Sequence, residues 1–118
     1  MKDYKFNGDL IPIDFEKSYN DSDSEILKKG IRAMNMDEKW DIIFDQNTLS
    51  FYRSWTGRGI FKIEFLHKDN QLIVEKAFVE EDFSNQQGVD SCSTILNKII
   101  EVIVLNKDPE FLKTKNES

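Results

Sequence analysis

The stretch from Lys39 to Phe83 decides the fold, and between Trp40 and Phe65 it reads WDIIFDQNTLSFYRSWTGRGIFKIEF. Apolar residues alternate here with polar ones at a period of two, which is typical of strands that bury one face. Turn-forming residues at Asp45–Asn47, Thr56–Gly59 and His67–Asn70 separate the runs. The segment therefore predicts an antiparallel meander of four strands. The alternating apolar positions are Trp40, Ile42, Phe44, Leu49, Phe51, Phe61, Ile63 and Phe65.

Segments with a helical period lie on both sides of this meander. Ser22-Asp23-Ser24-Glu25 has the spacing of a capping box. A polar loop from Ser84 to Gly88 leads to Asp90, which we expect to cap an apolar helix over Val89–Leu105. The predicted fold class is α+β, with one helix before the meander and one long apolar helix after it, packed on the sheet. The expected buried stripes are Ile26, Leu27, Ile31 and Met34 in the first helix, and Val89, Cys92, Leu96, Ile99 and Ile103 in the second.

The second predicted helix is apolar on more than one side. Its opposite flank carries Ile95, Ile100, Val102 and Val104. A helix of this kind is either buried on several sides or docked against another subunit. The sequence thus leaves two alternatives: burial within the chain, or a homodimer through Val89–Leu105.

The length of 118 residues is typical of one domain, so we expect residues 1–118 to form a single unit. Hydrophobic residues make up 39% of the chain, enough for a packed core. Residues 1–20 contain Pro12, which favours an extra edge strand or an extended arm. Residues 109–118 are polar and are expected to fray.

Charge and composition argue against several classes of protein. The formal net charge of −6 disfavours binding to nucleic acid, which depends on neutralising phosphates with Lys and Arg. No run approaches the roughly 20 apolar residues of a membrane span, and residues 1–5 lack the apolar core of a signal peptide. Cys92 is the only cysteine, which indicates a reducing compartment. We therefore expect a cytoplasmic protein.

The residues that best fit a binding site lie in Tyr52-Arg53-Ser54-Trp55-Thr56-Gly57-Arg58-Gly59. Guanidinium groups give forked, charge-assisted hydrogen bonds, aromatic rings give a stacking face, and glycine permits close backbone approach. This combination suits an anionic, partly flat ligand such as a nucleotide-like molecule. The candidate ligand-binding residues are Tyr52, Arg53, Ser54, Trp55, Thr56 and Arg58.

A purely structural interpretation of the same residues stands beside this one. Arg53 shares its strand face with apolar residues and is a candidate for an ion pair with Glu64 or Glu75 on adjacent strands. A tryptophan such as Trp55 is more often part of a core or an interface than a stacking platform. For the two glycines, Gly57 and Gly59, the turn is a better explanation than close approach of a ligand.

The segment and its surroundings resemble a small, poorly characterised bacterial protein family. The resemblance runs from Lys39-Trp40-Asp41-Ile42-Ile43-Phe44 through Leu49 and Tyr52 into Arg53-Ser54-Trp55-Thr56-Gly57, then Gly59-Ile60-Phe61. It covers roughly residues 36 to 105, and its Arg-Ser-Trp-Thr-Gly core is its most specific part. The resemblance implies a loose association with ADP-ribose-related or bacterial conflict systems.

This chain departs from that family after the fourth predicted strand. Relatives tend to carry an Asn-Arg-Asp-type segment there, whereas this chain has Phe78-Val79-Glu80-Glu81-Asp82. Any site that such an arginine completes is expected to be altered here.

Catalytic and metal-binding groups are sparse. His67 is the only histidine and falls in a predicted turn, which excludes a histidine-based triad or a multi-histidine metal site. Cys92 lies in an apolar stripe, where a thiolate is disfavoured. The run Glu80-Glu81-Asp82 is interpreted as a solvated strand end. No metal site and no cofactor is predicted.

Three functions follow, in order of preference. The first is a non-enzymatic protein that binds a nucleotide-like anion through Arg53 and Arg58, with Trp55 or Tyr52 stacking on it. The second is an immunity or inhibitor protein that presents an acidic surface to a basic protein partner. The third is a hydrolase on a nucleotide-like substrate with Glu75 or Glu80 as base, which only a pocket joining a carboxylate to Arg53 would favour.

Overall fold

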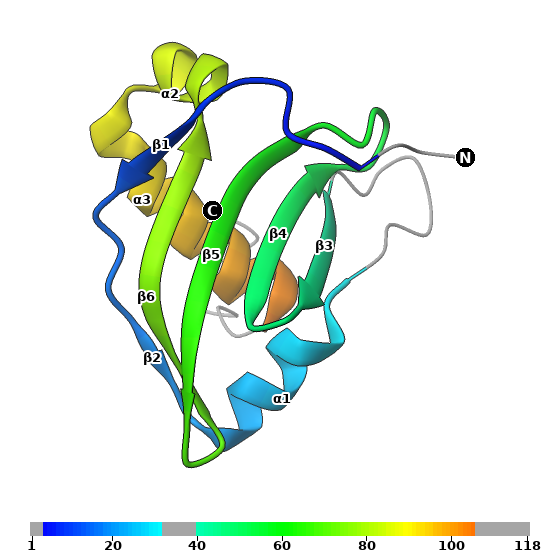
Figure 1. Cartoon of the computed structure of the whole chain (residues 1–118), viewed down its shortest axis with the longest axis vertical. Helices are drawn as coiled ribbons and strands as arrows, with labels where there is room; N and C mark the ends of the chain where they lie inside the picture. Colours follow the sequence, from blue (N-terminus) through cyan, green and yellow to red (C-terminus); the bar gives the residue numbers. More distant parts are fainter. Residues whose placement is uncertain (1–3, 32–39, 106–118) are drawn as a thin grey trace, which may run out of the picture.

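The computed structural model describes residues 4–31 and 40–105, which form an antiparallel sheet and its flanking helices (Figure 1). The strand order is β1-β6-β5-β4-β3, and β2 also pairs with β6. The predicted α+β class is confirmed, and so is the antiparallel meander, formed by β3 to β6. In chain order the elements are β1 (Leu10–Ile13), β2 (Ser18–Tyr19), α1 (Asp21–Lys29), β3 (Trp40–Asp45), β4 (Thr48–Arg53), β5 (Gly59–Lys68), β6 (Gln71–Glu80), α2 (Glu81–Gln87), α3 (Val89–Lys98) and the π-helix η1 (Ile99–Val104).

The sheet has six strands, so the prediction of four strands is wrong in number. The two additional strands come from the first twenty residues and both pair with the outer edge of β6: Leu10–Ile13 with Ala77–Glu80, and Ser18–Tyr19 with Leu72–Ile73. Without them the ten-residue β6 would leave a row of backbone groups unpaired. Pro12 is compatible with this position because an edge strand keeps one side free of ladder hydrogen bonds.

Two-residue turns join β3 to β4 and β5 to β6. Gln46 and Asn47 have φ angles of 50° and 61°, and Asp69 and Asn70 have φ angles of 51° and 67°. Positive φ at both central residues is the geometry of turns that match the right-handed twist of a hairpin, and Asn and Asp tolerate it. The turn predicted at His67–Asn70 is therefore shorter than expected, because His67 lies within β5, opposite Leu72.

Helix α1 begins two residues earlier than the capping-box spacing suggests. Asn20 is its N-cap, and its side chain accepts a hydrogen bond from the backbone N–H of Asp23. The helix ends at Gly30, whose φ of 67° is unfavourable for any residue with a Cβ. Ile31 then exchanges two backbone hydrogen bonds with Ile42 of β3. The predicted position Met34 lies outside the described residues.

The segment after β6 is helical where a polar loop was expected. Residues Glu81–Gln87 form α2, and the side chain of Glu80 caps this helix by accepting from the backbone N–H of Phe83. Gly88 separates α2 from α3, and Asp90 lies in the first turn of α3 rather than at its N-cap. The predicted single helix over Val89–Leu105 thus consists of α3 and η1, preceded by α2.

The core lies between the sheet and the helix formed by α3 and η1, which crosses behind the strands in Figure 1. Both flanks of that helix contribute, since Ile99 and Ile100 are both buried within this chain. Val89, predicted to be buried, is about half exposed. None of the described helices is long and apolar enough to cross a membrane. The largest fully buried apolar side chains are Phe51, Phe61, Leu27, Ile42, Leu49, Ile63, Leu72, Leu96 and Ile100.

Candidate functional site

The connection between β4 and β5 is a compact turn. The backbone N–H of Arg53 donates to the carbonyl of Arg58, and the N–H of Gly57 donates to the carbonyl of Arg53. Gly57 has a φ of 77°, so a glycine is favoured there. The hydroxyl of Thr56 accepts a hydrogen bond from the backbone N–H of Arg58. These contacts fix the spacing of the two arginines at the base of the turn.

The N-terminal segment holds this hairpin in place. The backbone of Lys5 donates to the carbonyl of Gly57 and accepts from the N–H of Gly59. A Cβ added at Gly59 would come within 2.5 Å of the Phe6 ring. Gly59 therefore serves close packing of Phe6 on the hairpin, which corrects the prediction that favoured the turn as the explanation of this glycine. Gly57 does serve the turn.

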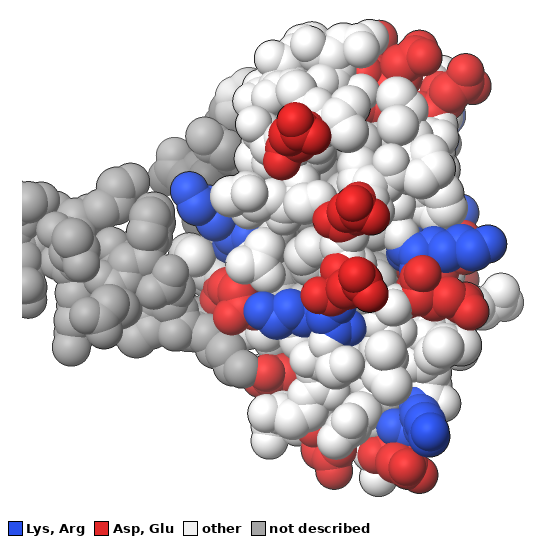
Figure 2. Space-filling view, turned by 90° about the vertical axis from the view of Figure 1, so that its left-hand side faces the viewer, with Lys and Arg blue, Asp and Glu red and all other residues white. Residues whose placement is uncertain are grey.

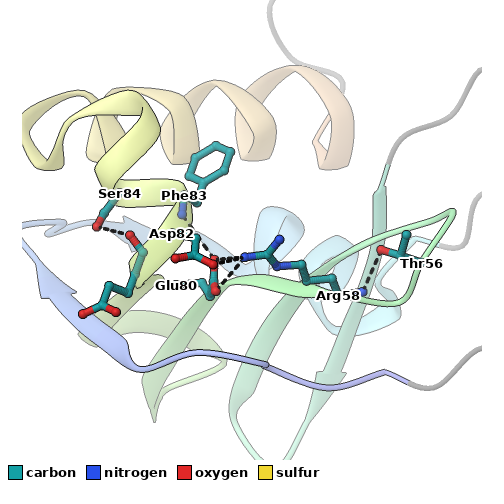
Figure 3. A network of polar contacts seen from close by, with 7 residues as sticks. Thr56, Arg58, Glu80, Asp82, Phe83 and Ser84 are labelled. Atoms are coloured by element: carbon teal, nitrogen blue, oxygen red, sulfur yellow. Dashed lines mark hydrogen bonds and ion pairs between the residues drawn. The ribbon is translucent and has the colours of Figure 1, made fainter.

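A pocket of about 220 Å³ opens between this hairpin and α2. Its walls carry two guanidinium groups, one carboxylate, one hydroxyl, one amide, one aromatic ring and one aliphatic side chain. Figure 3 shows Arg58 reaching from the hairpin toward Glu80 and Asp82 at the start of α2. The lining residues are Arg53, Thr56, Arg58, Ile60, Glu80, Phe83 and Gln86.

Arg53 is held by aromatic rings. Its guanidinium carbon lies 4.5 Å from the centroid of the Trp40 ring and 5.9 Å from that of Phe83. Burial lowers the pKa of Arg53, and the charge of Arg58 adds to this effect. The predicted ion pair with Glu64 or Glu75 is not formed, and within residues 4–31 and 40–105 the Arg53 side chain has no carboxylate partner.

Arg58 is paired with two carboxylates. Its Nη2 atom donates to both oxygens of Glu80 at 2.8 Å and to Oδ2 of Asp82 at 3.0 Å. The hydrogen bond to Glu80 raises the pKa of Arg58 above its ordinary value, against the opposing effect of burial. Arg58 thus links the hairpin to the end of β6 and the start of α2 (Figure 3).

Glu80 anchors this region from a fully buried position, with 0% of its surface exposed. Besides Arg58, it accepts from the backbone N–H of Phe83 at 3.2 Å. The N-terminal segment passes so close to this carboxylate that a Cβ at Gly8 would lie 2.7 Å from Oε2 of Glu80. The interpretation of Glu80-Glu81-Asp82 as a solvated strand end is therefore wrong for Glu80, because a carboxylate with this many donors is stable when buried.

The structure brings three of the six predicted site residues to the pocket: Arg53, Thr56 and Arg58. The other three lie elsewhere. Tyr52 packs its ring against Tyr4 and Phe6, with centroids 5.0 and 5.5 Å apart. Ser54 is buried, and Trp55 is 67% exposed, and neither lines the pocket.

Four lining residues were not among the predicted ligand-binding residues: Ile60, Glu80, Phe83 and Gln86. Of these, Glu80 was predicted only as a candidate base of a hydrolase. The position of Glu80 could have been found from the β5–β6 hairpin. Pairing residues of the two strands outward from their turn brings Glu80 beside the start of β5. Phe83 and Gln86 reach the pocket only because α2 is a helix that starts at the pocket, and the polar composition of that segment suggested a loop.

The described residues contain no cluster of three or more His, Cys, Asp or Glu side chains suited to a metal ion. His67 contacts the ammonium group of Lys28, with 3.2 Å between Nζ and Nε2. Cys92 is fully buried, burial raises the pKa of its thiol, and its Sγ lies 3.3 Å from the carbonyl oxygen of Gly88. Neither side chain lines the pocket.

No protein-family model, no curated protein and no solved structure matches the chain. The resemblance to the family with the Arg-Ser-Trp-Thr-Gly core therefore stays a prediction.

Proposed function

We propose that this protein binds a small anionic ligand, nucleotide-like in character, in the pocket between the β4–β5 hairpin and α2. The observation that carries the proposal is an arginine in the pocket that has no carboxylate partner among the described residues. Glu80 and Asp82 both pair with Arg58. Arg53 also lines the pocket and pairs with no carboxylate among the described residues, although the chain has a formal net charge of −6.

The surroundings of Arg53 support a role in ligand binding. Trp40 and Phe83 hold the guanidinium through cation–π contacts, which use none of its N–H groups as hydrogen-bond donors, so those donors can serve an acceptor in the pocket. Partial burial strengthens an interaction with an anion, because the local dielectric is lower than in water. A positioned arginine also loses little entropy on binding.

The size of the pocket limits what it encloses. A volume of about 220 Å³ is below the roughly 300–1,000 Å³ typical of clefts that surround a drug-sized ligand. We therefore assign the pocket to the anionic group of the ligand, with the remainder outside it. Thr56 and Gln86 supply neutral hydrogen-bonding groups beside the two arginines.

The stacking role predicted for the aromatic residues now rests on Trp55. Tyr52 already packs against the rings of Tyr4 and Phe6. Trp55 lies in the same hairpin and exposes two thirds of its surface, so it is the better candidate for contact with the part of the ligand outside the pocket.

The alternative of an acidic surface for a basic protein partner has less support. Figure 2 shows Lys and Arg side chains between the Asp and Glu side chains on the face it presents. The described part of this face therefore carries no continuous acidic patch. A complementary patch of one sign is what steers a basic partner.

A hydrolase requires a carboxylate that can accept a proton from substrate or water. The pocket does join a carboxylate, Glu80, to Arg53. However, both oxygens of Glu80 already accept hydrogen bonds from Arg58, and one also accepts from the backbone of Phe83. This is the arrangement of a structural anchor, and we propose binding without catalysis.

Thermal melts test the proposal. The wild type is titrated with inorganic phosphate, ADP and ADP-ribose, because a ligand that binds only the native state stabilises it by RT ln(1 + [L]/Kd), about 2.7 kcal/mol at 100 Kd. We expect Tm to rise with a phosphate-bearing compound, and the rise to vanish in Arg53→Ala. Lys68→Ala is the matched control, since it removes one positive charge at the far end of β5.

If no compound shifts Tm of the wild type, or if Arg53→Ala responds as strongly as the wild type does, the proposed anion site is wrong. The same titration of Lys68→Ala separates loss of the site from a general loss of positive charge.

A further inference from the structure

The two carboxylates on Arg58 differ in how firmly they are held. Glu80 is fully buried and has a second donor in the backbone of Phe83. The Asp82 side chain is 64% exposed, and among the described residues it pairs with the same Nη2 atom of Arg58 alone, at 3.0 Å. Asp82 can therefore leave Arg58 without disturbing the core, whereas Glu80 cannot.

Arg58 also carries a donor that the resting arrangement does not use. Three carboxylate oxygens converge on Nη2, which has only two hydrogens. The Nε atom is buried and has no hydrogen-bond partner among the described residues. Buried donors are nearly always paired, so an unpaired one calls for an explanation such as an absent acceptor.

We infer that Asp82 occupies the position on Arg58 that an oxyanion of the ligand takes, and that binding of the ligand releases Asp82. The inference rests on the proposed function of the pocket. Two oxygens of one anionic group can accept from Nη2 and Nε together, the bidentate arrangement typical of arginine with phosphate. A third oxygen is then available for Arg53, which also lines the pocket.

This arrangement selects the chemical class of the ligand. A carboxylate offers two oxygens and one negative charge, the same as the Asp82 group it must displace. A phosphoryl group offers three oxygens and a charge of about −2. The phosphoryl group therefore gains contacts and charge in the exchange, and Asp82 acts as an internal competitor that keeps carboxylates out.

Asp82→Asn tests the inference against Glu81→Gln. Both substitutions remove one negative charge from the first turn of α2, but only Asp82 contacts Arg58. Isothermal titration with inorganic pyrophosphate and ADP measures Kd for the wild type and both variants. Because an exposed ion pair contributes little, we expect Kd of Asp82→Asn to be lower by about two- to fivefold, with Glu81→Gln close to the wild type.

A second measurement needs no variant. The Nε–H signal of Arg58 in the nitrogen–proton NMR spectrum of the wild type is expected to shift downfield on addition of pyrophosphate, and much less on addition of acetate. This shift reports directly on Nε of Arg58, the donor that lacks a partner among the described residues. The measurement uses the wild type, so it can be interpreted even if Asp82→Asn lowers stability.

The outcomes separate the two proposals. Tighter binding by Asp82→Asn alone, with the Nε–H shift, supports the inference. Equal Kd in the wild type and Asp82→Asn, or equal tightening by Glu81→Gln, overturns it while the proposed function stands. If the wild type and both variants bind neither pyrophosphate nor ADP, the proposed function fails and the inference fails with it.

Discussion

Arg53 and Trp40 are register partners on adjacent strands, and the guanidinium carbon of Arg53 lies 4.5 Å from the centroid of the Trp40 ring. This cross-strand pair lets an arginine occupy the core-facing side of β4 at the end of the sheet. The aromatic face replaces the carboxylate that a half-buried arginine otherwise requires. The positive charge therefore remains available at the pocket.

Trp40→Leu is expected to lower the free energy of unfolding by about 2–4 kcal/mol, because it removes a large and almost fully buried ring. In a double-mutant cycle with Arg53→Met, we expect a coupling of about 0.5–1 kcal/mol from the cation–π contact. Urea unfolding of the four proteins provides the measurement. A coupling near zero would show that the ring only fills space beside Arg53.

Glu80→Gln tests the buried ion pair at the opposite wall of the pocket. Removing one partner of such a pair is strongly destabilising, and because Arg58 is 34% exposed we expect a loss of about 2–3 kcal/mol. Glu81→Gln, on the exposed neighbour, should change stability by less than about 0.5 kcal/mol. Urea unfolding at low and high salt distinguishes the two, and equal losses would mean that Glu80 has no special role.

The meander could be predicted from sequence because its signals are local. Alternation at Trp40, Ile42, Phe51 and Phe61 marks one face, and paired turn residues such as Asp69 and Asn70 fix the hairpins. The strands β1 and β2 could not be predicted with the same certainty. Their pairing with β6 spans about 60 residues of sequence and depends on an edge that only the folded sheet creates.

The candidate site was predictable only on one side. The arginines of the hairpin are adjacent in sequence and chemically distinctive, so Arg53 and Arg58 stood out. The acidic wall did not, because a Glu-Glu-Asp run has the composition of an exposed strand end. Burial of Glu80 follows from the position of Arg58, and a single sequence does not record that long-range pairing.

Gly59→Ala is expected to destabilise the protein by about 1–3 kcal/mol, because the new methyl group would overlap the Phe6 ring. The double variant Phe6→Ala/Gly59→Ala removes the overlap, so its loss should be smaller than the sum of the two single losses. Thermal unfolding of the three variants measures this. If the loss of stability in the double variant equals the sum of the two single losses, the packing of Phe6 against Gly59 is contradicted.

Tyr19 provides a prediction about pH. Its hydroxyl is buried without a hydrogen-bond partner among the described residues, and burial, followed by the charges of Glu101 and Asp23, raises its pKa well above the ordinary value near 10. In the unfolded chain Tyr19 therefore loses its proton at a lower pH than in the folded protein. The wild type should lose stability as pH rises above about 10, by up to about 1.4 kcal/mol per pH unit from this residue.

Tyr19→Phe removes both the titrating group and the unpaired hydroxyl. At pH 7 we expect its stability to equal that of the wild type or to exceed it by up to about 1 kcal/mol, because no hydrogen bond to a described residue is lost. Between pH 9 and 11 its unfolding free energy should fall less steeply than that of the wild type. Urea unfolding at each pH gives both curves, and parallel curves would show that Tyr19 ionises equally in the folded and unfolded states.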